Sequence, residues 1–324
     1  MEFNIQKTEG KFEQVISKRL LVLNGIMVFG IIGTVFLIYG LLNIPKEEDT
    51  AFTNPVIMSN AFANIAINAK SAYVFDVSAN RAVYKKDEFV QMPLASITKL
   101  MTAVVATESV PENSKITIRK EFLLPSGDSG LVEGEDWRLK DLLDFSLVVS
   151  SNDGTYSIAS VVGAMSLNST DYEIGREEFI KKMNDKAKEL GLFQTYFIND
   201  SGLDEGLLSG GYGSAIDVAK LMQYALKNHS NILEATKYSE LTIDSLDASH
   251  SIENTNKEVA SIPGVIASKT GFTDMAGGNL VVAFDAGIGQ PFIVVVLGGT
   301  PEGRFEDISK LVAATQQYIT EENK

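Results

Sequence analysis

The chain has 324 residues, a formal net charge of −14 and no cysteine. The acidic balance argues against nucleic-acid binding and wide contact with anionic lipid, and the lack of cysteine excludes disulfides, cysteine nucleophiles and cysteine-ligated metals. The length allows two domains, or one large domain with an anchor.

Residues 20–43 carry no charge and are rich in Leu, Ile, Val, Phe and Gly. As a helix this run would be about 36 Å long, enough to cross a bilayer with some tilt. It lacks the polar face of an amphipathic core helix, and it is longer than the apolar core of a typical signal peptide. We therefore favour an uncleaved transmembrane anchor over a buried helix or a cleaved signal.

The flanks of this run set its expected orientation. Lys18 and Arg19 precede it directly. The positive-inside rule then places residues 1–19 in the cytoplasm and the large domain outside the membrane. Residues 44–66, which contain two prolines and several asparagines, are predicted to be a linker to a domain at 67–324.

Within the domain, hydrophobic patterning predicts strands near both ends and helices between them. Strands at 70–77 and 81–85 are joined by Ser78-Ala79-Asn80, three residue types common in turns. The later patterns predict helices at 96–109, 138–149, 151–163, 176–190, 214–227 and about 304–319, and strands at 264–270, 279–284 and 292–297. This order indicates a sheet with helices packed on it and a helical insertion at about 110–255.

Ser96 and Lys99 are the first candidates for chemistry. The apolar residues after Ser96 recur at helical spacing, and side chains three apart on a helix share a face. A serine hydroxyl needs a base beside it, and a lysine can be that base if burial or a second cation lowers its pKa. Taken alone, Ser96 could be a helix N-cap and Lys99 a solvated lysine, because about one Ser-x-x-Lys is expected by chance in a chain of this length.

Two further motifs follow in the chain. Ser150-Ser151-Asn152 lies between two helical patterns, where a loop could present Ser150 and Asn152 to a cleft. Lys269-Thr270-Gly271 precedes the apolar run 280–284 and is predicted to be a strand followed by a turn. Ser-x-Asn alone is a weak signal, since residues 78–80 and 166–168 also match it.

With these three motifs in this order, the chain resembles serine-type D-alanyl-D-alanine carboxypeptidases, the low-molecular-mass penicillin-binding proteins. The resemblance covers about residues 69–311, and its matching stretches are 72–76, 92–103, 202–204 and 269–273. It implies an α+β, β-lactamase/transpeptidase-like fold. Such a fold has an antiparallel sheet flanked by helices, an all-helical subdomain and a site in the cleft between them, here preceded by one transmembrane helix.

The resemblance also implies a mechanism that needs no cofactor or metal. Ser96 would attack the terminal peptide bond, Lys99 would accept its proton, and Ser150 would relay a proton to the leaving amine. Lys269 is the candidate cation that lowers the pKa of Lys99. The expected substrate-binding residues are Asn152, Lys269, Thr270 and Gly271, and the expected oxyanion hole is formed by the backbone N–H groups of Ser96 and Phe272.

The expected substrate is a peptidoglycan stem peptide ending in D-Ala-D-Ala, with β-lactams as covalent inhibitors. No nucleic acid is expected as a partner, and the membrane is contacted through residues 20–43. The chain would then be a single-pass protein of the bacterial cytoplasmic membrane. A D,D-endopeptidase of the same family stays open as an alternative. A β-lactamase is disfavoured, because no acidic residue occurs from 154 to 166 where that class needs a glutamate. A catalytically inactive wall-binding module is disfavoured by the intact motifs.

Two tempting features are set aside. Gly127-Asp128-Ser129-Gly130 suggests a trypsin-like serine, but no histidine precedes it. The only histidines, His229 and His250, are expected to be solvated and are too few for a zinc site.

Overall fold

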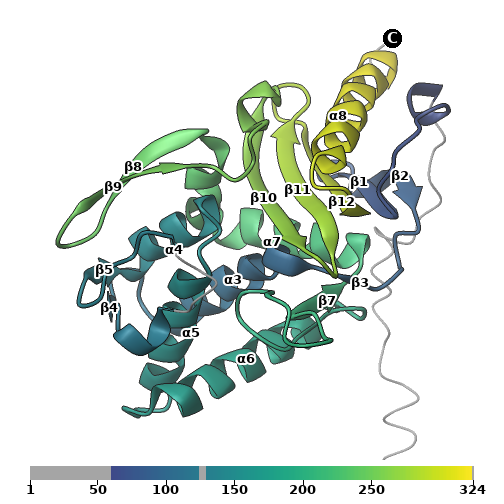
Figure 1. Cartoon of the computed structure of the whole chain (residues 1–324). Helices are drawn as coiled ribbons and strands as arrows, with labels where there is room; N and C mark the ends of the chain where they lie inside the picture. Colours follow the sequence, from purple (N-terminus) through teal and green to yellow (C-terminus); the bar gives the residue numbers. More distant parts are fainter. Residues whose placement is uncertain (1–59, 124–128, 323–324) are drawn as a thin grey trace, which may run out of the picture. The chain divides into compact units, whose positions relative to one another are not determined.

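The computed structural model describes residues 60–123 and 129–322 (Figure 1). The chain divides into two units, residues 1–50 and 51–324, and every described residue lies in the second. The predicted anchor at 20–43 therefore lies outside the described residues. Within the described part of the chain, none of the helices has the length and apolarity that a membrane span requires.

A five-stranded antiparallel sheet is the centre of the domain, in the order β10-β11-β12-β1-β2. Its strands are β1 (Ser71–Asp76), β2 (Arg81–Lys86), β10 (Val265–Thr273), β11 (Gly277–Asp285) and β12 (Pro291–Gly299). All five predicted strands are confirmed. The turn between β1 and β2 places Asn80 at φ 51°, a left-handed conformation that asparagine tolerates.

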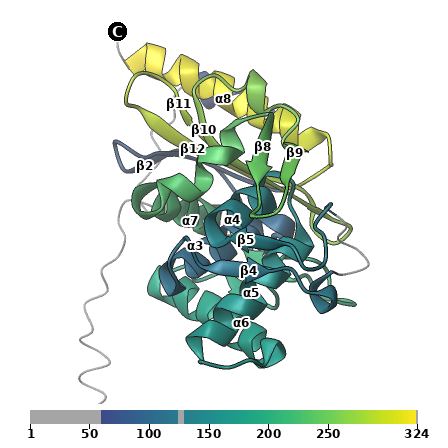
Figure 2. The same cartoon turned by 90° about the vertical axis from the view of Figure 1, so that its left-hand side faces the viewer.

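Helices cover both faces of this sheet. Helix α8 (Gly303–Glu322) lies on one face and α7 (Ala215–Asn228) on the other (Figure 2). Successive residues of β12 alternate between the two layers, so Val296 packs with the α8 side and Val295 with the α7 side. The sheet is therefore buried on both faces, which explains the nearly continuous apolar runs in its central strands.

The packed part of the chain begins before residue 67. The 3₁₀ turn η2 (Asn60–Phe62) lies in the stretch that the sequence analysis assigns to the linker. The ring of Phe62 is buried, with centroid distances of 5.6 Å to Tyr84 and 6.1 Å to Tyr318. Residues 60–62 thus belong to the hydrophobic core under α8.

The helical region lies between β2 and β10 in sequence and packs beside the sheet (Figure 1). Side chains cap three of its helices: Ser151, Asp171 and Ser214 each accept a bond from a backbone N–H of the first turn. The helices are α3 (Lys99–Ser109), α4 (Leu139–Val148), α5 (Asn152–Ser166) and α6 (Tyr172–Glu189), and the 3₁₀ turns are η3 (Ala95–Thr98), η4 (Lys120–Phe122), η5 (Ser230–Lys237) and η6 (Val259–Ser261). The predicted helices are confirmed, with two differences. The helix expected from residue 96 opens as the 3₁₀ turn η3, and α6 begins four residues before 176, at the Asp171 cap.

Short strand pairs, which the hydrophobic pattern did not predict, complete this region. They are β3 (Met92–Pro93), β7 (Gly211–Gly213) and β6 (Tyr196–Phe197) in one small sheet, β4 (Lys115–Thr117) with β5 (Asp136–Arg138), and β8 (Glu240–Asp244) with β9 (Ser249–Glu253). They are two to five residues long, too short for a periodic signal.

The expectation of solvated histidines is wrong. His250 lies on β9, contacts the buried Glu135 at 2.6 Å and packs against the Trp137 ring at 4.9 Å. His229 contacts Glu108 at 3.0 Å. Both side chains are at most 16% exposed, so both are structural contacts between segments.

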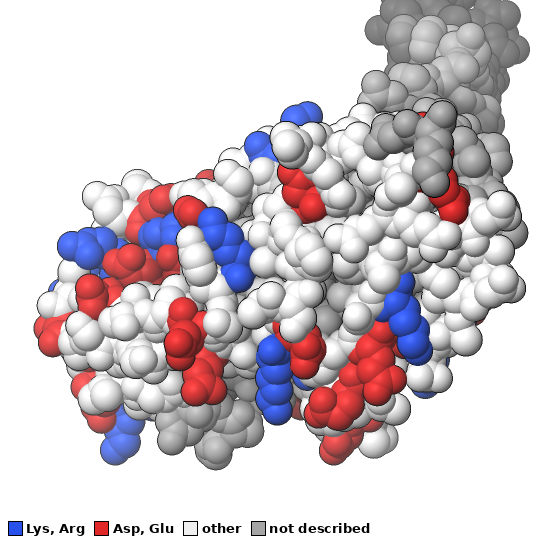
Figure 3. All heavy atoms as spheres, turned by 90° about the horizontal axis from the view of Figure 1, so that it is seen from above, with Lys and Arg blue, Asp and Glu red and all other residues white. Residues whose placement is uncertain are grey.

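Neither acidic nor basic side chains dominate the face shown in Figure 3. Acidic and basic side chains lie beside one another there, and wide uncharged areas separate the groups. An extended basic patch of the kind that nucleic acid requires is not visible on this face.

Candidate active site

Ser96 and Lys99 meet where η3 passes into α3. The Nζ of Lys99 donates to the Ser96 hydroxyl at 2.9 Å, as the three-residue spacing predicts. The same Nζ contacts Asn152 Oδ1 at 2.8 Å and the backbone carbonyl of Ser201 at 2.9 Å. Lys99 is fully buried, and in the described part of the chain these three oxygens are the hydrogen-bond partners of its amine.

These partners determine what a neutral Lys99 can do. A neutral amine has two N–H donors and one lone pair, whereas the ammonium has three donors. The carbonyl oxygens of Asn152 and Ser201 can only accept. The Ser96 hydroxyl is therefore the one partner of the three that can donate to the lone pair, which is the arrangement that a nucleophile and its base require.

Burial makes the neutral form accessible. It lowers the pKa of Lys99 to about 7, although the charge of Asp200 acts in the opposite direction. The sequence analysis names Lys269 as the candidate cation that lowers this pKa, but the lowering is caused by burial.

Lys269 lies on β10 and is also buried. Its Nζ donates to the Ser150 hydroxyl and to the backbone carbonyl of Thr270, each at 2.9 Å. Burial, followed by the charges of Lys99 and Arg304, lowers the pKa of Lys269 well below its ordinary value. The site thus disfavours the ammonium form of Lys269, and an anionic ligand beside it would favour that form.

Two non-glycine residues in this region have left-handed backbone conformations. Ala95, directly before the nucleophile, has φ 48°, and Ser150 has φ 63°. Such conformations cost about 1–3 kcal/mol each and persist only when the surroundings impose them. The contacts of Ser151 hold the left-handed conformation of Ser150. The Ser151 N–H donates to the Ser146 carbonyl. The Ser151 hydroxyl accepts from the Gly154 N–H and contacts the Ser129 hydroxyl at 2.6 Å.

Two glycines allow other segments to approach η3, the turn that carries Ser96. A Cβ on Gly202 would lie 1.9 Å from the Ala95 carbonyl oxygen, and one on Gly271 would lie 2.7 Å from the Leu94 oxygen. The sequence analysis names Gly271 only as a substrate-binding residue. The structure gives it a packing role, since it lets β10 lie against η3.

Strand β10 is at the edge of the sheet, and its backbone explains the expected role of Phe272. The N–H of Ser268 points away from β11 and donates to Thr236 Oγ1 at 3.1 Å. Because N–H directions alternate along a strand, the N–H groups of Thr270 and Phe272 point to the same side. The Phe272 N–H is therefore directed away from the sheet, as an oxyanion donor has to be.

Thr255 and Arg304 support this strand, and sequence reasoning missed both. Thr255 Oγ1 contacts Thr270 Oγ1 at 2.7 Å and the Val148 carbonyl at 3.3 Å, so it joins the Lys-Thr-Gly strand to the end of α4. Arg304 donates through Nη1 to the Gly271 carbonyl at 2.8 Å. Neither residue belongs to a motif, and no pattern in the sequence marks them.

The structure thus brings together the predicted site residues from three distant segments. Lys99 contacts Asn152, and Lys269 contacts Ser150, so each motif touches another one. The other two Ser-x-Asn matches lie elsewhere, in the β1–β2 turn and at the end of α5. The arrangement is that of a serine acyl-transfer site with two buried lysines.

Comparison with known proteins agrees with this geometry. A family model for D-alanyl-D-alanine carboxypeptidases, peptidase S11, matches residues 57–300. The chain is 30% identical to the D-alanyl-D-alanine carboxypeptidase DacF of Bacillus subtilis over 80% of its own length and 65% of that protein. It is 34% identical to a D-alanyl-D-alanine endopeptidase of Haemophilus influenzae over 66% of its length and 69% of that protein.

Solved structures show the same fold. Penicillin-binding protein D2 of Listeria monocytogenes in its ampicillin-bound form is 31% identical, with a TM-score of 0.66 over 78% of this chain and 98% of that one. The Streptomyces K15 DD-transpeptidase is 26% identical, with a TM-score of 0.69 over 77% and 97%. The chain therefore belongs to the D-alanyl-D-alanine carboxypeptidase family, peptidase S11, and has the α+β DD-transpeptidase fold.

Proposed function

We propose that this protein is a serine D,D-carboxypeptidase that removes the terminal D-alanine from peptidoglycan stem peptides ending in D-Ala-D-Ala. The observation that carries the proposal is the contact set of Lys99. Of the three oxygens that its buried amine contacts in the described part of the chain, only the Ser96 hydroxyl is able to donate to a neutral amine.

In the acylation step, Ser96 Oγ attacks the carbonyl carbon of the penultimate D-alanine while Lys99 Nζ accepts the hydroxyl proton. The N–H groups of Ser96 and Phe272 stabilise the negative charge on the carbonyl oxygen. The C–N bond then breaks, and the leaving amine takes a proton from Ser150. The Lys269 ammonium, 2.9 Å from Ser150 Oγ, replaces that proton.

In the deacylation step, water attacks the ester, and Lys99 accepts a proton from the water and returns one to Ser96. Lys99 must therefore release to solvent the proton that it took from Ser96, and Lys269 must regain from solvent the proton that it gave to Ser150, before deacylation begins. A pKa of about 7 allows Lys99 to release its proton near neutral pH.

Substrate binding would use the edge of β10. An extended peptide can add to an exposed strand edge through main-chain hydrogen bonds. The free carboxylate would meet Thr270 and Lys269, and Asn152 would hold the peptide backbone. A bound carboxylate would offset the positive charge of Lys269, which favours its protonated form and thus its role as proton donor.

A D,D-endopeptidase that cuts peptide cross-links is the second candidate. It is supported by the 34% identity to the Haemophilus influenzae endopeptidase. Both reactions would use the same acyl-enzyme, and they differ only in the group on the leaving amine.

We also propose an extracytoplasmic location, with residues 20–43 as the anchor. The support is the uncharged length of this run and the basic residues before it. This location would place the site beside its polymeric substrate.

Covalent labelling and product analysis test the function together. The protein is incubated with a fluorescent penicillin, the labelled peptide is located by mass spectrometry, and Ser96→Ala is the control. A parallel incubation with a pentapeptide stem and with a cross-linked dimer measures released D-alanine and released monomer. An adduct on another serine would refute the nucleophile assignment, and release of monomer without D-alanine would favour the endopeptidase.

A further inference from the structure

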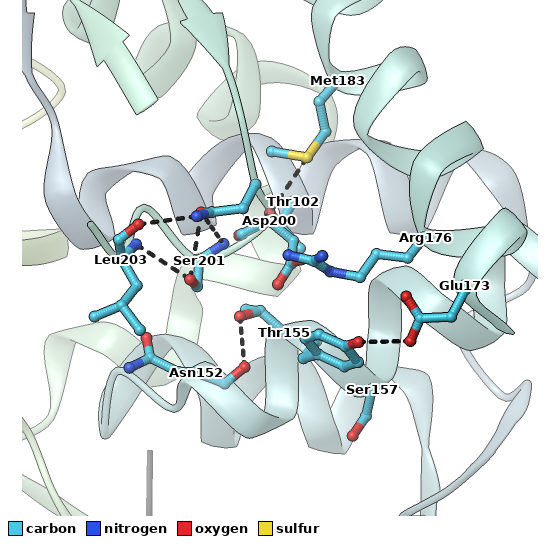
Figure 4. A network of polar contacts seen from close by, with 12 residues as sticks. Thr102, Asn152, Thr155, Ser157, Glu173, Arg176, Met183, Asp200, Ser201 and Leu203 are labelled. Carbon is cyan, nitrogen blue, oxygen red and sulfur yellow. Dashed lines mark hydrogen bonds and ion pairs between the residues drawn. The ribbon is translucent and has the colours of Figure 1, made fainter. Parts of the chain in front are cut away.

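A buried ion pair lies next to the amine of Lys99. Arg176 Nε on α6 is 2.7 Å from Asp200 Oδ1, and the Asp200 side chain is 1% exposed. The Arg176 guanidinium also lies 4.5 Å from the centre of the Tyr156 ring on α5. Figure 4 shows Arg176 reaching from its helix toward Asp200.

Backbone contacts fix Asp200 against the helix that carries Lys99. The Asp200 carbonyl accepts from Thr102 Oγ1 at 2.6 Å, and the carbonyl of the next residue, Ser201, accepts from Lys99 Nζ at 2.9 Å. Thr102 and Lys99 are three apart on α3 and so lie on the same face. Any movement of Asp200 would therefore be transmitted to a hydrogen-bond acceptor of the Lys99 amine.

We propose that Asp200 is a positioning residue for Lys99 and that the ion pair with Arg176 fixes its carboxylate beside the amine. This role rests on the proposed function, in which Lys99 is the base. The pair lies outside the three motifs, and neither residue has any other assigned task.

The physical reason is a balance between burial and charge. Burial without a nearby anion would make Lys99 too weak a base, because desolvation disfavours the ammonium. A carboxylate beside it favours the ammonium, so the amine becomes more basic and titrates near the pH at which it works. A charge buried to this degree needs a partner, and the Arg176 guanidinium on the other side of Asp200 supplies it.

Other charged groups near Lys99 have to be considered in any pH profile. Among the described residues on the elements packed against α3 and η3, they are Lys269 on β10, Arg304 on α8, Tyr156 on α5, Arg176 on α6, Asp200, Asp204 and Glu205 on the 198–210 segment, Asp144 on α4 and Asp217 on α7. Of these groups, Asp200 is the one whose charge raises the pKa of Lys99.

The test measures the rate of penicillin acylation of Ser96 as a function of pH. The rate should fall at low pH as Lys99 becomes protonated, and the midpoint of this fall reports the pKa of Lys99. In Asp200→Asn the anion is gone and the Arg176 cation is left unpaired, so this midpoint should fall by about one pH unit. In the double variant Asp200→Asn/Arg176→Gln the unpaired cation is gone too. Its midpoint should lie between those of the wild type and the single variant.

A matched control is Asp307→Asn, which removes another buried carboxylate, paired with Lys310 on α8 and bonded to the N–H groups of Asn68 and Ala69 rather than to a site residue. Its midpoint should not move. A purely structural role for Asp200 would lower the rate at every pH and leave the midpoint in place, and that result would overturn the inference. If Asp200→Asn does not fold, the double variant decides, because its midpoint must still lie below that of the wild type. A wild-type protein without any adduct on Ser96 would instead refute the proposed function.

Discussion

Lowering the pH from 8 to 6 should slow acylation of Ser96 by about tenfold, because Lys99 must be neutral to accept the hydroxyl proton. With a pKa of about 7, Lys99 is mostly neutral at pH 8 and mostly protonated at pH 6. An ordinary lysine would stay protonated over this whole range.

The titration of Lys99 should also appear in the pH dependence of the free energy of unfolding. The difference between the ordinary value of 10.5 and about 7 corresponds to about 5 kcal/mol, the free energy by which the fold disfavours the ammonium. Because the folded pKa is below the unfolded one, stability is lost as the pH falls from about 10.5 to about 7, and the loss is complete below that. Lys99→Met lacks this titration, so its stability relative to the wild type should rise by about 1.4 kcal/mol per pH unit as the pH falls through this window.

Stopped-flow fluorescence with a labelled penicillin between pH 5.5 and 9 gives the rate, and chemical denaturation at the same pH values gives the free energy of unfolding. Lys182→Met is a suitable control. Lys182 is a lysine on α6 whose Nζ donates to Ser166, outside the active site, so its loss should leave the midpoint near 7. A rate that does not change between pH 6 and 8, or a midpoint above 9, would show that Lys99 is not the base.

Three substitutions test other parts of the site. Lys269→Gln should reduce turnover of a peptide with a free terminal carboxylate far more than that of a matched amide or ester, and equal losses on both would argue against carboxylate recognition. Gly271→Ala should slow penicillin acylation by at least tenfold and lower the melting temperature, because its Cβ would lie 2.7 Å from the Leu94 oxygen; unchanged values for both would contradict the packing role. Thr255→Val, which keeps the shape of the side chain but removes its contact with Thr270, should raise KM for the carboxylate substrate several-fold, whereas Thr255→Ser should retain the wild-type value.

The fold could be predicted from the sequence where a pattern is long. The strands of the main sheet have runs of apolar residues, and α6 and α7 have clear helical periods, so their positions were predicted to within a few residues. The short ribbons β4–β5 and β8–β9 carry too few residues for such a pattern. For this reason His250 was taken as solvated, although β9 places it against Glu135 and Trp137.

The site was predictable where residue type and order carry the chemistry. The pairing of Ser96 with Lys99 could be predicted from local helical spacing. The order of the three motifs identified Ser150 and Lys269 as site residues. Thr255, Arg304 and the Asp200–Arg176 pair act through contacts between segments that only the folded chain brings together. A pKa depends on burial, so the cause of the low value for Lys99 could not be obtained from the spacing alone.

The sheet joins the two ends of the domain, so the fold depends on contacts between segments that are far apart in the sequence. β1 pairs with β12, and the N–H groups of Asn68 and Ala69 donate to Asp307, 239 and 238 residues further along. Contacts of such sequence separation close large loops and slow folding. During synthesis, β1 can pair with β2 at once, but its pairing with β12 must wait until the last third of the chain has emerged. A chain that stops before β10 would contain Ser96 and Lys99 but would lack Lys269 and three of the five strands of the main sheet, so we expect incomplete chains to be inactive.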